Sequence, residues 1–364
     1  MAINAHRVSA GEALRVLKAG WAQQKRGHLT TSWMLHGRPG VGKTELVQEL
    51  ASDIGAELYD LRLTTIEPQD LRGLPFYDHD NKKTVWFPPE DLPDTSEPAI
   101  LFLDELTAAS QQLQPTVYGL LQERRVGRRT LPASVFIVAA GNSVEDGAVA
   151  YEMGTALSDR MVHMIVQADP EDWLKNYAPR ASIHPTVAAF LRSRPDLLDT
   201  TETSLRRGDA IACTPRSWTR VSAILASEAD RDARNVMIAG TIGAAAAAEF
   251  ALVVDDIASS VQVHAMLTTM RAKRAELYPE NLHGLTALVF ALASATTQDT
   301  LPAAIEILAD LPMLDRPGLP VSELAAFGFE LLISRAMEEG WHQVFATSAA
   351  YAEYSESRVQ AGLV

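Results

Sequence analysis

The sequence predicts an α/β domain with a mostly parallel sheet, followed by an all-helical region. Up to about residue 168, apolar runs that read as strands alternate with helical patterns, which is typical of a parallel sheet with helices on both faces. After about residue 169 the strand signals stop, and Ala- and Leu-rich helical patterns replace them. A glycine-rich turn between an early strand and the next helix adds the context that a phosphate-binding loop requires.

The first elements of the α/β part follow one another in order. Residues 9–12 form a capping box, which predicts a first helix. Residues 32–36 are a short extended run that meets the glycine-rich turn at 37–42. Apolar residues at helical spacing over 46–54, with Gly55 where a carboxyl-terminal cap belongs, predict a second helix.

Four later apolar runs complete the predicted sheet, and two of them are so apolar that we expect both faces to be buried. These runs are residues 57–63, 99–103, 134–140 and 161–168. Two short apolar segments at 74–77 and 84–87 predict a β-hairpin inserted after the second strand. The helical region is predicted from the periodic segments 218–226, 235–254, 285–293, 302–311 and 321–337.

Composition supports a folded chain of more than one domain. The chain has 364 residues, of which 47% are hydrophobic, and its 32 basic and 46 acidic residues give a formal charge of −14. This acidity disfavours a protein whose main task is to hold nucleic acid, because such binding relies on clustered Lys and Arg. The single cysteine cannot form an internal disulfide, and the histidines show no zinc-ligand spacing, so we expect a reducing, cytoplasmic setting.

No segment predicts export or a membrane span. The amino terminus lacks an apolar run that ends in a cleavage site, so we expect the mature chain to start at Met1. Residues 236–254 are rich in Ala and Gly and include Glu249, whereas a spanning helix needs about 20 strongly apolar residues. We expect this stretch to be a buried helix.

One motif predicts a nucleotide site. The pattern G-x-x-x-x-G-K-[ST] lets backbone N–H groups surround a phosphate at the positive end of a helix. In this pattern Lys43 reaches the β- and γ-phosphates, and the Thr44 hydroxyl coordinates Mg²⁺. We therefore predict ATP and Mg²⁺ as cofactors, bound by Gly37, Arg38, Pro39, Gly40, Val41, Gly42, Lys43 and Thr44.

Two carboxylates and an amide follow the ends of apolar strands. Asp104 stands where phosphate-loop enzymes place the acid that holds Mg²⁺, and Glu105 can then polarise the attacking water. Asn142 ends a later strand, and its amide can orient that water. Taken alone, the two acids also fit an exposed strand end, and Gly141 with Asn142 also fits a simple turn.

Taken in order, these residues resemble the AAA+ ATPases, and within them the MoxR family. The resemblance covers roughly residues 30–225. It is carried by residues 37–44, 103–105 and 120–124, and by a stretch that runs from Asn142 through Glu152–Thr155 to Asp159 and Arg160. It implies an AAA+ phosphate-loop NTPase fold with a nucleotide-binding domain at 1–168, an all-helical lid at 169–265 and a helical carboxyl-terminal extension at 266–364.

The resemblance also implies roles for two arginines and two hairpins. Arg160 is the candidate arginine finger for a neighbouring subunit's γ-phosphate, although it could instead form a salt bridge within its own chain. Arg216 lies in a sensor-2-like element and would contact the γ-phosphate of its own subunit, although Pro215 before it is also a common helix start. Residues 74–87 match the helix-2 insert, and 123–131 match the pre-sensor-1 hairpin; their arginines could grip an acidic segment or simply lie in solvent.

The resemblance implies a hexameric ring that uses ATP to remodel, activate or load cofactor into a protein partner. It further implies a partner with a von Willebrand factor A domain. Two alternatives stay open, a nucleic-acid-acting AAA+ motor and a small-molecule phosphoryl transferase. The overall acidity disfavours the first, and the second leaves the set Glu105, Asn142, Arg160 and Arg216 without a joint explanation.

Overall fold

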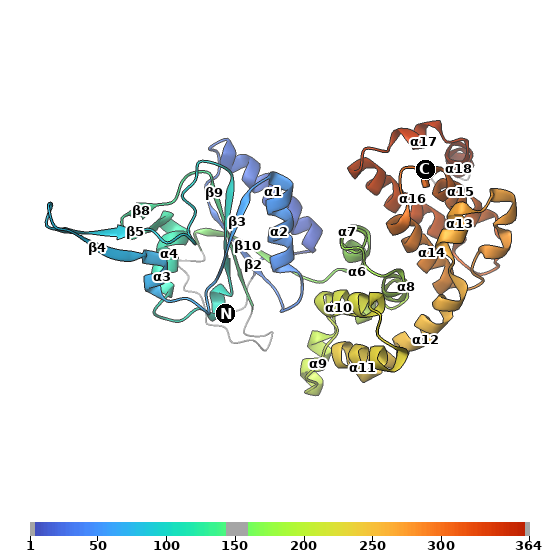
Figure 1. Ribbon diagram of the computed structural model, residues 1–364, viewed down its shortest axis with the longest axis horizontal. Helices are drawn as coiled ribbons and strands as arrows, with labels where there is room; N and C mark the ends of the chain where they lie inside the picture. Colours follow the sequence, from blue (N-terminus) through green and yellow to red (C-terminus); the bar gives the residue numbers. More distant parts are fainter. Residues whose placement is uncertain (1–3, 143–158, 361–364) are drawn as a thin grey trace. The chain divides into compact units, whose positions relative to one another are not determined.

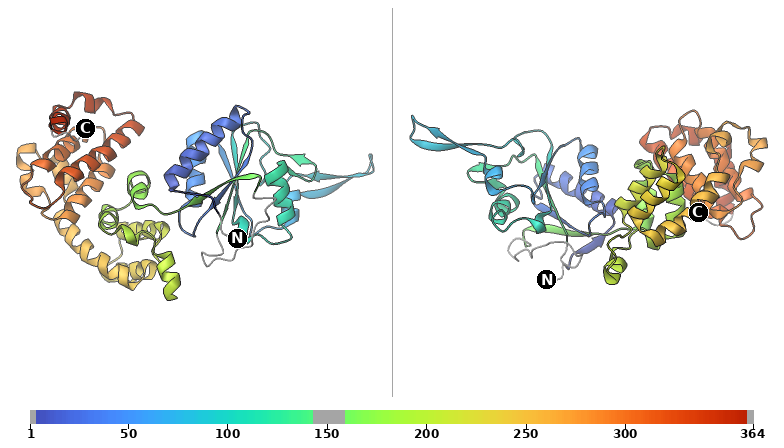
Figure 2. Two further views of the ribbon diagram at one scale, coloured as in Figure 1. Left: turned by 180° about the vertical axis from the view of Figure 1, so that it is seen from behind. Right: turned by 60° about the horizontal axis from the view of Figure 1, so that its bottom comes forward.

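The computed structural model describes residues 4–142 and 159–360, and the chain divides into two compact units. One unit contains the chain up to Asp169 together with Thr201–Asp209, and the other contains Pro170–Thr200 and the chain from Ala210 onward. The division of the helical part into a lid at 169–265 and an extension at 266–364 stays a prediction. Figures 1 and 2 show the α/β unit in blue to green and the helical unit in green to red.

The α/β unit is built on a six-stranded sheet in which every neighbouring pair is parallel. Its spatial order is β1 (His6–Val8), β10 (Met161–Val166), β2 (Ser32–His36), β9 (Val135–Gly141), β6 (Ala99–Asp104) and β3 (Glu57–Arg62). The predicted parallel sheet is therefore confirmed, and β6 and β9 are buried along their whole length. The sequence did not predict β1, because this edge strand has only three residues, two of them exposed.

Helices cover both faces of the sheet (Figure 1). On one face, α1 (Ala10–Lys25) and α2 (Lys43–Ile54) share an apolar core with residues of β2, β6 and β9. On the other face, α3 (Pro68–Arg72) and α4 (Gln114–Glu123) pack on the alternate residues of the same strands. The predicted capping box is present, because the Ser9 hydroxyl accepts from the Glu12 backbone N–H while the Glu12 carboxylate accepts from that of Ser9.

Two small hairpins extend the α/β unit. The strands β4 (Leu74–Asp78) and β5 (Lys83–Phe87) pair antiparallel, as predicted, and project from the sheet on the side of α3 and α4 (Figures 1 and 2). The second hairpin pairs β7 (Arg125–Val126) with β8 (Arg129–Thr130). A short 3₁₀ turn, Leu106–Ala108, follows β6.

The second unit contains helices and no strand among the residues that the structure describes, which confirms the predicted helical region. A π-helical turn at Trp173–Tyr177 lies between its first two helices. Its helices are α6 (Pro170–Asp172), α7 (Ala178–Arg180), α8 (Pro185–Ser193), α10 (Pro215–Ala226), α11 (Arg231–Ile242), α12 (Ala244–Ser260), α13 (Val263–Thr268), α14 (Leu282–Ala295), α15 (Leu301–Asp310), α16 (Val321–Glu338), α17 (Gln343–Thr347) and α18 (Ala349–Gln360).

The expectation of one buried helix over 236–254 was wrong. Gly243 has φ +85°, a conformation that favours glycine, and it separates α11 from α12. Val236 and Leu252 are 74% and 76% exposed, whereas Ile238 and Phe250 are buried, so each helix buries only one of its faces. Within the described ranges, no helix is both long enough and apolar enough to cross a lipid bilayer.

Candidate nucleotide site

The phosphate-loop motif forms the connection between β2 and α2. Gly40 and Gly42 have φ values of +82° and +102°, where a side chain would be strained, so both positions favour glycine. A Cβ atom on Gly37 would lie 2.5 Å from the carbonyl oxygen of Val166 in the neighbouring strand. The glycines therefore let the loop turn tightly beside β10 and direct the amino terminus of α2, a favourable position for an anion, toward the loop.

Lys43 is buried at the first position of α2 and its ammonium is fully engaged with oxygen atoms. Nζ donates to the carbonyl oxygens of Gly37 at 2.6 Å and Arg38 at 3.0 Å, and to Oδ1 of Asn142 at 3.0 Å. The structure thus brings two predicted site residues, Lys43 and Asn142, into direct contact. Phosphate oxygens entering the loop would compete for the same ammonium.

Asp104 meets Thr44 across an intervening strand. The strand β9 lies between β2 and β6, and it ends in the small residues Ala139, Ala140 and Gly141. A Cβ atom on Gly141 would lie 2.7 Å from the Thr107 side chain and 2.9 Å from Cε of Met34, so this crossing has no room for one. Thr44 Oγ1 donates to Asp104 Oδ2 at 3.3 Å. A hydroxyl and a carboxylate at one point are oxygen ligands of the kind that Mg²⁺ prefers, so these two residues fit the predicted metal.

Asn142 is held at the end of β9 by a residue that the sequence analysis missed. The Thr107 hydroxyl donates to the Asn142 carbonyl oxygen at 2.9 Å and accepts from the Asn142 backbone N–H at 3.0 Å. This reciprocal pair fixes the backbone of Asn142, so its amide side chain is directed at Lys43. Thr107 lies two residues beyond Glu105, and no motif distinguishes it from other threonines.

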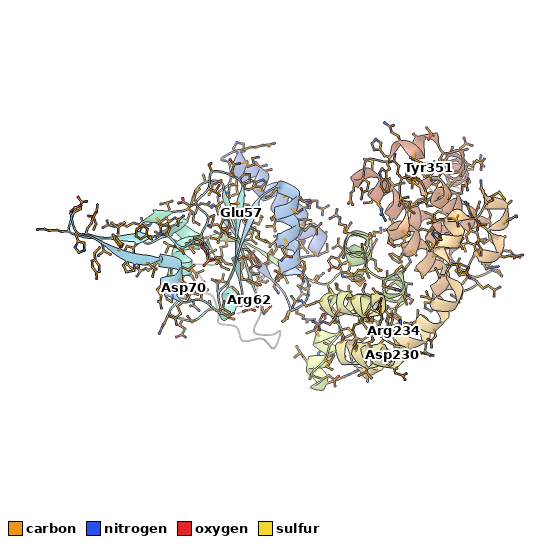
Figure 3. The ribbon with its side chains drawn as sticks, in the orientation of Figure 1. Glu57, Arg62, Asp70, Asp230, Arg234 and Tyr351 are labelled. Carbon is orange, nitrogen blue, oxygen red and sulfur yellow. The ribbon has the colours of Figure 1, made fainter. Side chains whose placement is uncertain are left out.

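Glu105 points toward the neighbouring strand β3. Its backbone has φ +59°, an uncommon conformation for a residue with a side chain, and its N–H donates to Asp104 Oδ1 at 2.8 Å. Its carboxylate accepts a short hydrogen bond from the Thr64 hydroxyl, and Arg62 Nε lies 3.9 Å from its other oxygen. Figure 3 marks the two ends of β3 with Glu57 and Arg62. Glu105 is therefore next to the site but bonded to the residues that follow β3, a contact that the sequence did not predict.

Arg160 lies at the opposite end of the sheet from the phosphate loop. It directly precedes β10, where Met161 pairs with Ser32 at the start of β2, and its carbonyl oxygen accepts from the Thr31 hydroxyl at 3.4 Å. The phosphate loop follows the other end of β2. Five residues of strand at ~3.3 Å each separate the two ends by ~16 Å. The structure therefore does not bring Arg160 to the phosphate loop of its own chain.

Arg216 lies in the other compact unit, on the first turn of α10. The predicted helix start is confirmed, because Thr214 caps α10 through reciprocal side-chain bonds with Ser217, and Pro215 occupies the first helical position. The Arg216 side chain is exposed. Its contact with a γ-phosphate stays a prediction, and the Glu152–Thr155 stretch lies outside the described residues.

A pair of histidines lies directly behind the phosphate loop. His36 ends β2, is 2% exposed, and its Nε2 lies 2.8 Å from Nδ1 of His163 on β10, with the two rings stacked. Burial, followed by the His163 ring and the Lys43 charge, lowers the pKa of His36 from 6.5 to about 4. The ring that precedes Gly37 is thus neutral at ordinary pH and adds no charge to the loop.

The four-arginine cluster is only partly available to a partner. Arg124 donates to the carbonyl oxygens of Pro132 at 2.9 Å and Val135 at 2.5 Å, and burial lowers its pKa. Arg129 lies 3.3 Å from the Asp94 carboxylate. These two arginines hold their own hairpin in place, so a grip on an acidic segment would depend on the exposed Arg125 and Arg128.

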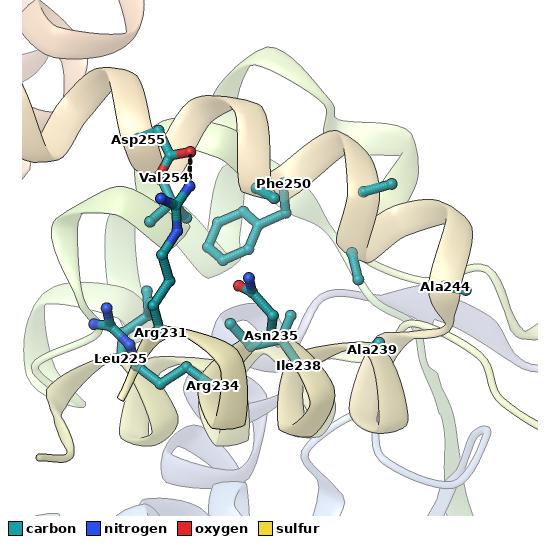
Figure 4. Close-up of a pocket in the computed structure, with 13 residues that line it drawn as sticks. Leu225, Arg231, Arg234, Asn235, Ile238, Ala239, Ala244, Phe250, Val254 and Asp255 are labelled. Carbon is teal, nitrogen blue, oxygen red and sulfur yellow. Dashed lines mark hydrogen bonds and ion pairs between the residues drawn. The ribbon is translucent and has the colours of Figure 1, made fainter. Parts of the chain in front are cut away.

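A pocket of about 410 Å³ lies in the helical unit between α11 and α12. Figure 4 shows Phe250 and Asn235 pointing into it and an ion pair between Arg231 and Asp255 at one end. Most of its lining is alanine and other apolar side chains. It contains none of the predicted site residues and no phosphate-binding loop, so it is not a candidate for the nucleotide site.

Comparison with known proteins supports the assignment of the α/β unit. Residues 32–161 match the profile of the AAA domain (dynein-related subfamily). A curated relative, the uncharacterized protein YeaC of Bacillus subtilis, is 29% identical over 149 residues, which are 40% of this chain and 44% of YeaC. The chain thus spans less than half the length of that relative.

The solved structures that match part of this chain share little sequence with it. A provisionally assigned ATPase from Cytophaga hutchinsonii is 21% identical, with 48% of this chain and 51% of that chain covered and a TM-score of 0.36. RuvB of Thermotoga maritima, a Holliday junction branch migration motor, is 16% identical, with 78% and 80% covered and a TM-score of 0.38. Likenesses at this level say nothing about what the chain acts on.

The parallel sheet, the phosphate loop between β2 and α2 and the flanking helices define an AAA+ phosphate-loop NTPase fold. Within that class, residues 32–161 carry the AAA domain of the dynein-related type. This domain contains Lys43, Thr44, Asp104, Glu105 and Asn142.

Proposed function

We propose that this chain is a Mg²⁺-dependent ATPase that works as a ring on a protein partner. The hydrolytic part rests on one observation: at the phosphate loop, Lys43 is hydrogen-bonded to Asn142, and the next residue, Thr44, is hydrogen-bonded to Asp104. A structural glycine turn would not require a buried ammonium, a carboxylate and an amide to converge on it. These are the groups that bind a triphosphate and its metal.

Each residue of the network has a task in this proposal. Lys43 binds the β- and γ-phosphate oxygens, and Thr44 and Asp104 hold Mg²⁺, which neutralises phosphate charge when bound. The Glu105 carboxylate accepts the proton of the attacking water after its hydrogen bond with Thr64 breaks. Asn142 orients that water. Arg216 would contact the γ-phosphate from the helical unit.

Ring assembly is proposed from the position of Arg160. The arginine lies ~16 Å along β2 from its own phosphate loop, which is too far to stabilise charge there. An arginine can act at a nucleotide only where it reaches the phosphate, so the neighbouring subunit's site is the proposed target. Six subunits, as the MoxR resemblance implies, would give each site one arginine from its neighbour.

A protein client is proposed from the hairpin β4–β5. One of its faces consists of Leu74, Phe76, Val85 and Phe87, which are 75%, 57%, 38% and 56% exposed. An isolated two-stranded hairpin is only marginally stable in water, and exposed apolar patches commonly mark protein contacts. The face contains no base-stacking groove lined with cations, so it favours a protein over nucleic acid. A partner with a von Willebrand factor A domain is the specific candidate that the resemblance suggests.

The test is ATP hydrolysis by the full chain, with and without Mg²⁺, compared with Lys43→Ala. We expect released phosphate that depends on Mg²⁺, and loss of nucleotide binding in the variant because the ammonium that contacts the phosphates is gone. Arg128→Ala is the matched control, because it removes an exposed cation away from the loop. Turnover unaffected by Lys43→Ala would refute the site.

Salt-dependent stimulation by DNA would redirect the proposal to a nucleic-acid motor. Transfer of phosphate to a small acceptor, in place of free phosphate, would redirect it to a phosphoryl transferase. Native mass spectrometry in the presence of ATP tests the ring, and a monomer alone would exclude it.

A further inference from the structure

A short helix from the second half of the chain lies against the phosphate loop. This helix, α9 (Thr201–Arg207), belongs to the α/β unit, although Thr200 and Ala210 on either side of it belong to the helical unit. Its Glu202 carboxylate lies 3.1 Å from Nη2 of Arg38, the second residue of the phosphate loop. The chain therefore leaves the helical unit, contacts the loop through one ion pair and returns.

Glu202 is surrounded by positive charge. Its carboxylate also pairs with Arg206 one turn along α9, and Arg7 of β1 contributes from further away. The bond from Arg38, followed by the charge of Arg206, lowers the pKa of Glu202 below its usual value. Glu202 is thus ionised at neutral pH, and its charge opposes that of Arg38 in the loop.

The contact connects to the helix that carries Arg216. The Thr200 backbone N–H donates to the Cys213 carbonyl oxygen at 3.0 Å, and the Cys213 N–H donates to the Thr200 hydroxyl at 2.9 Å. These two hydrogen bonds join the two ends of the segment 200–213, which contains α9. The next residue, Thr214, is the amino-terminal cap of α10. A movement of α9 would therefore act directly on the start of the Arg216 helix.

We propose that Glu202 is a positioning residue that competes with nucleotide phosphate for Arg38. The Arg38 carbonyl oxygen lies 3.0 Å from the Lys43 ammonium, so the Arg38 side chain starts close to where phosphates would bind. A polyphosphate in the loop attracts the guanidinium and weakens its pair with Glu202. Without this ion pair α9 is free to move, and its movement changes the position of the start of α10. This inference rests on the proposed nucleotide site.

The experiment measures Mg²⁺–ADP affinity and hydrogen–deuterium exchange of residues 201–209 in the full chain. In the wild type, ADP should raise exchange in α9. In Glu202→Gln, exchange should be fast with or without ADP, and ADP should bind ~2–5-fold more tightly, the range expected for a solvent-exposed pair. Arg38→Gln should bind ADP more weakly by a similar factor, because this variant lacks the guanidinium that attracts the phosphates.

Two variants control for charge and for helix stability. Asp209→Asn removes an acidic side chain from the same segment and leaves the Arg38–Glu202 ion pair intact. Arg206→Gln removes the Arg206–Glu202 ion pair within α9 and also leaves the Arg38–Glu202 ion pair intact. Both should keep the response of α9 to ADP. If Arg206→Gln abolished it as fully as Glu202→Gln does, helix stability would account for the response and the proposal would fail.

The outcomes separate this inference from the proposed function. A wild type that does not bind ADP, or binds it equally well after Lys43→Ala, would overturn the nucleotide site itself. A wild type that binds ADP through Lys43 but shows unchanged exchange at α9 would overturn only the role of Glu202. Weaker ADP binding by Glu202→Gln would overturn it as well, because competition requires tighter binding.

Discussion

The two ends of the central sheet differ sharply in how their polar residues are connected. At the carboxyl ends of the strands, Lys43 is hydrogen-bonded to Asn142, Thr44 is hydrogen-bonded to Asp104, and the Glu105 backbone N–H donates to Asp104. At the amino ends, Arg160 directly precedes β10, and its carbonyl oxygen accepts a hydrogen bond from the Thr31 hydroxyl. The sheet thus gathers the groups proposed to bind nucleotide and activate water at one end, and the proposed arginine finger lies at the other.

This difference indicates which steps, nucleotide binding or hydrolysis, one chain could perform by itself. The carboxyl end holds the groups proposed to bind a nucleotide and its metal, because parallel strands all end there and deliver their terminal residues to one edge. At the amino end, Arg160 is the member of the predicted set that directly precedes a strand. If hydrolysis needs Arg160, a second copy of the chain must provide it.

Arg160→Ala should give the largest effect. An arginine supplied from another subunit contributes on the order of 10³–10⁵ to the rate of phosphoryl transfer, so hydrolysis should fall by about that factor while ATP affinity stays unchanged. Steady-state phosphate release and nucleotide titration measure the two quantities. Mixing this variant with Lys43→Ala subunits should restore part of the activity, because some interfaces then combine an intact loop with an intact arginine. Absence of rescue would mean that the two ends of the sheet do not work in different subunits.

Glu105→Gln should give the next largest effect, at the carboxyl end itself. Loss of a general base typically costs about 10²–10⁴ in rate, and the amide keeps the size of the side chain, so ATP should still bind. Single-turnover hydrolysis with bound ATP isolates this step. Glu123→Gln is the matched control, because Glu123 is exposed at the end of α4 and pairs with Arg125. Normal turnover by Glu105→Gln would remove it from the mechanism.

His36 makes the stability of the loop end depend on pH. Its pKa is 6.5 when unfolded and about 4 when folded, so between these values the unfolded chain binds a proton that the folded chain does not. Stability should therefore fall as pH decreases from 6.5 to 4, by up to about 3 kcal/mol. Urea unfolding of His36→Gln should lack this part of the pH dependence, whereas His79→Gln, at an exposed position, should keep it. Equal slopes for both variants would mean that His36 titrates normally.

Residues that end apolar strands could be predicted from the sequence, and residues that support them could not. Asp104 and Asn142 follow strands that are wholly buried, and that pattern alone places both at one edge of the sheet. Thr107 and Thr64 act through single hydroxyl bonds, which leave no periodic or motif signal. Glu202 is 164 positions from Arg38, and only the folded chain brings them together.

The errors in the predicted fold arise where the local sequence pattern is short or ambiguous. The strand β1 has three residues and cannot show an alternating pattern. In the stretch 236–254, the high helix propensity of alanine predicts one continuous helix, but the positive φ of Gly243 ends α11. Helix propensity alone cannot distinguish one long helix from two shorter antiparallel helices when a single glycine forms the break between them.

Thr64→Val should have the smallest effect and should act in the opposite direction. The Thr64 hydroxyl holds the Glu105 carboxylate beside β3, and a hydrogen bond of this kind contributes about 1 kcal/mol. Without it, Glu105 spends more time free to face the attacking water, so hydrolysis in the absence of a partner should rise ~5-fold. Thr65→Val is the matched control, because its hydroxyl donates to the Arg62 carbonyl oxygen at 2.9 Å and does not touch Glu105. A slower Thr64→Val enzyme would show that Thr64 supports the active position of Glu105, and the carboxyl end would then already be assembled for hydrolysis without any change at β3.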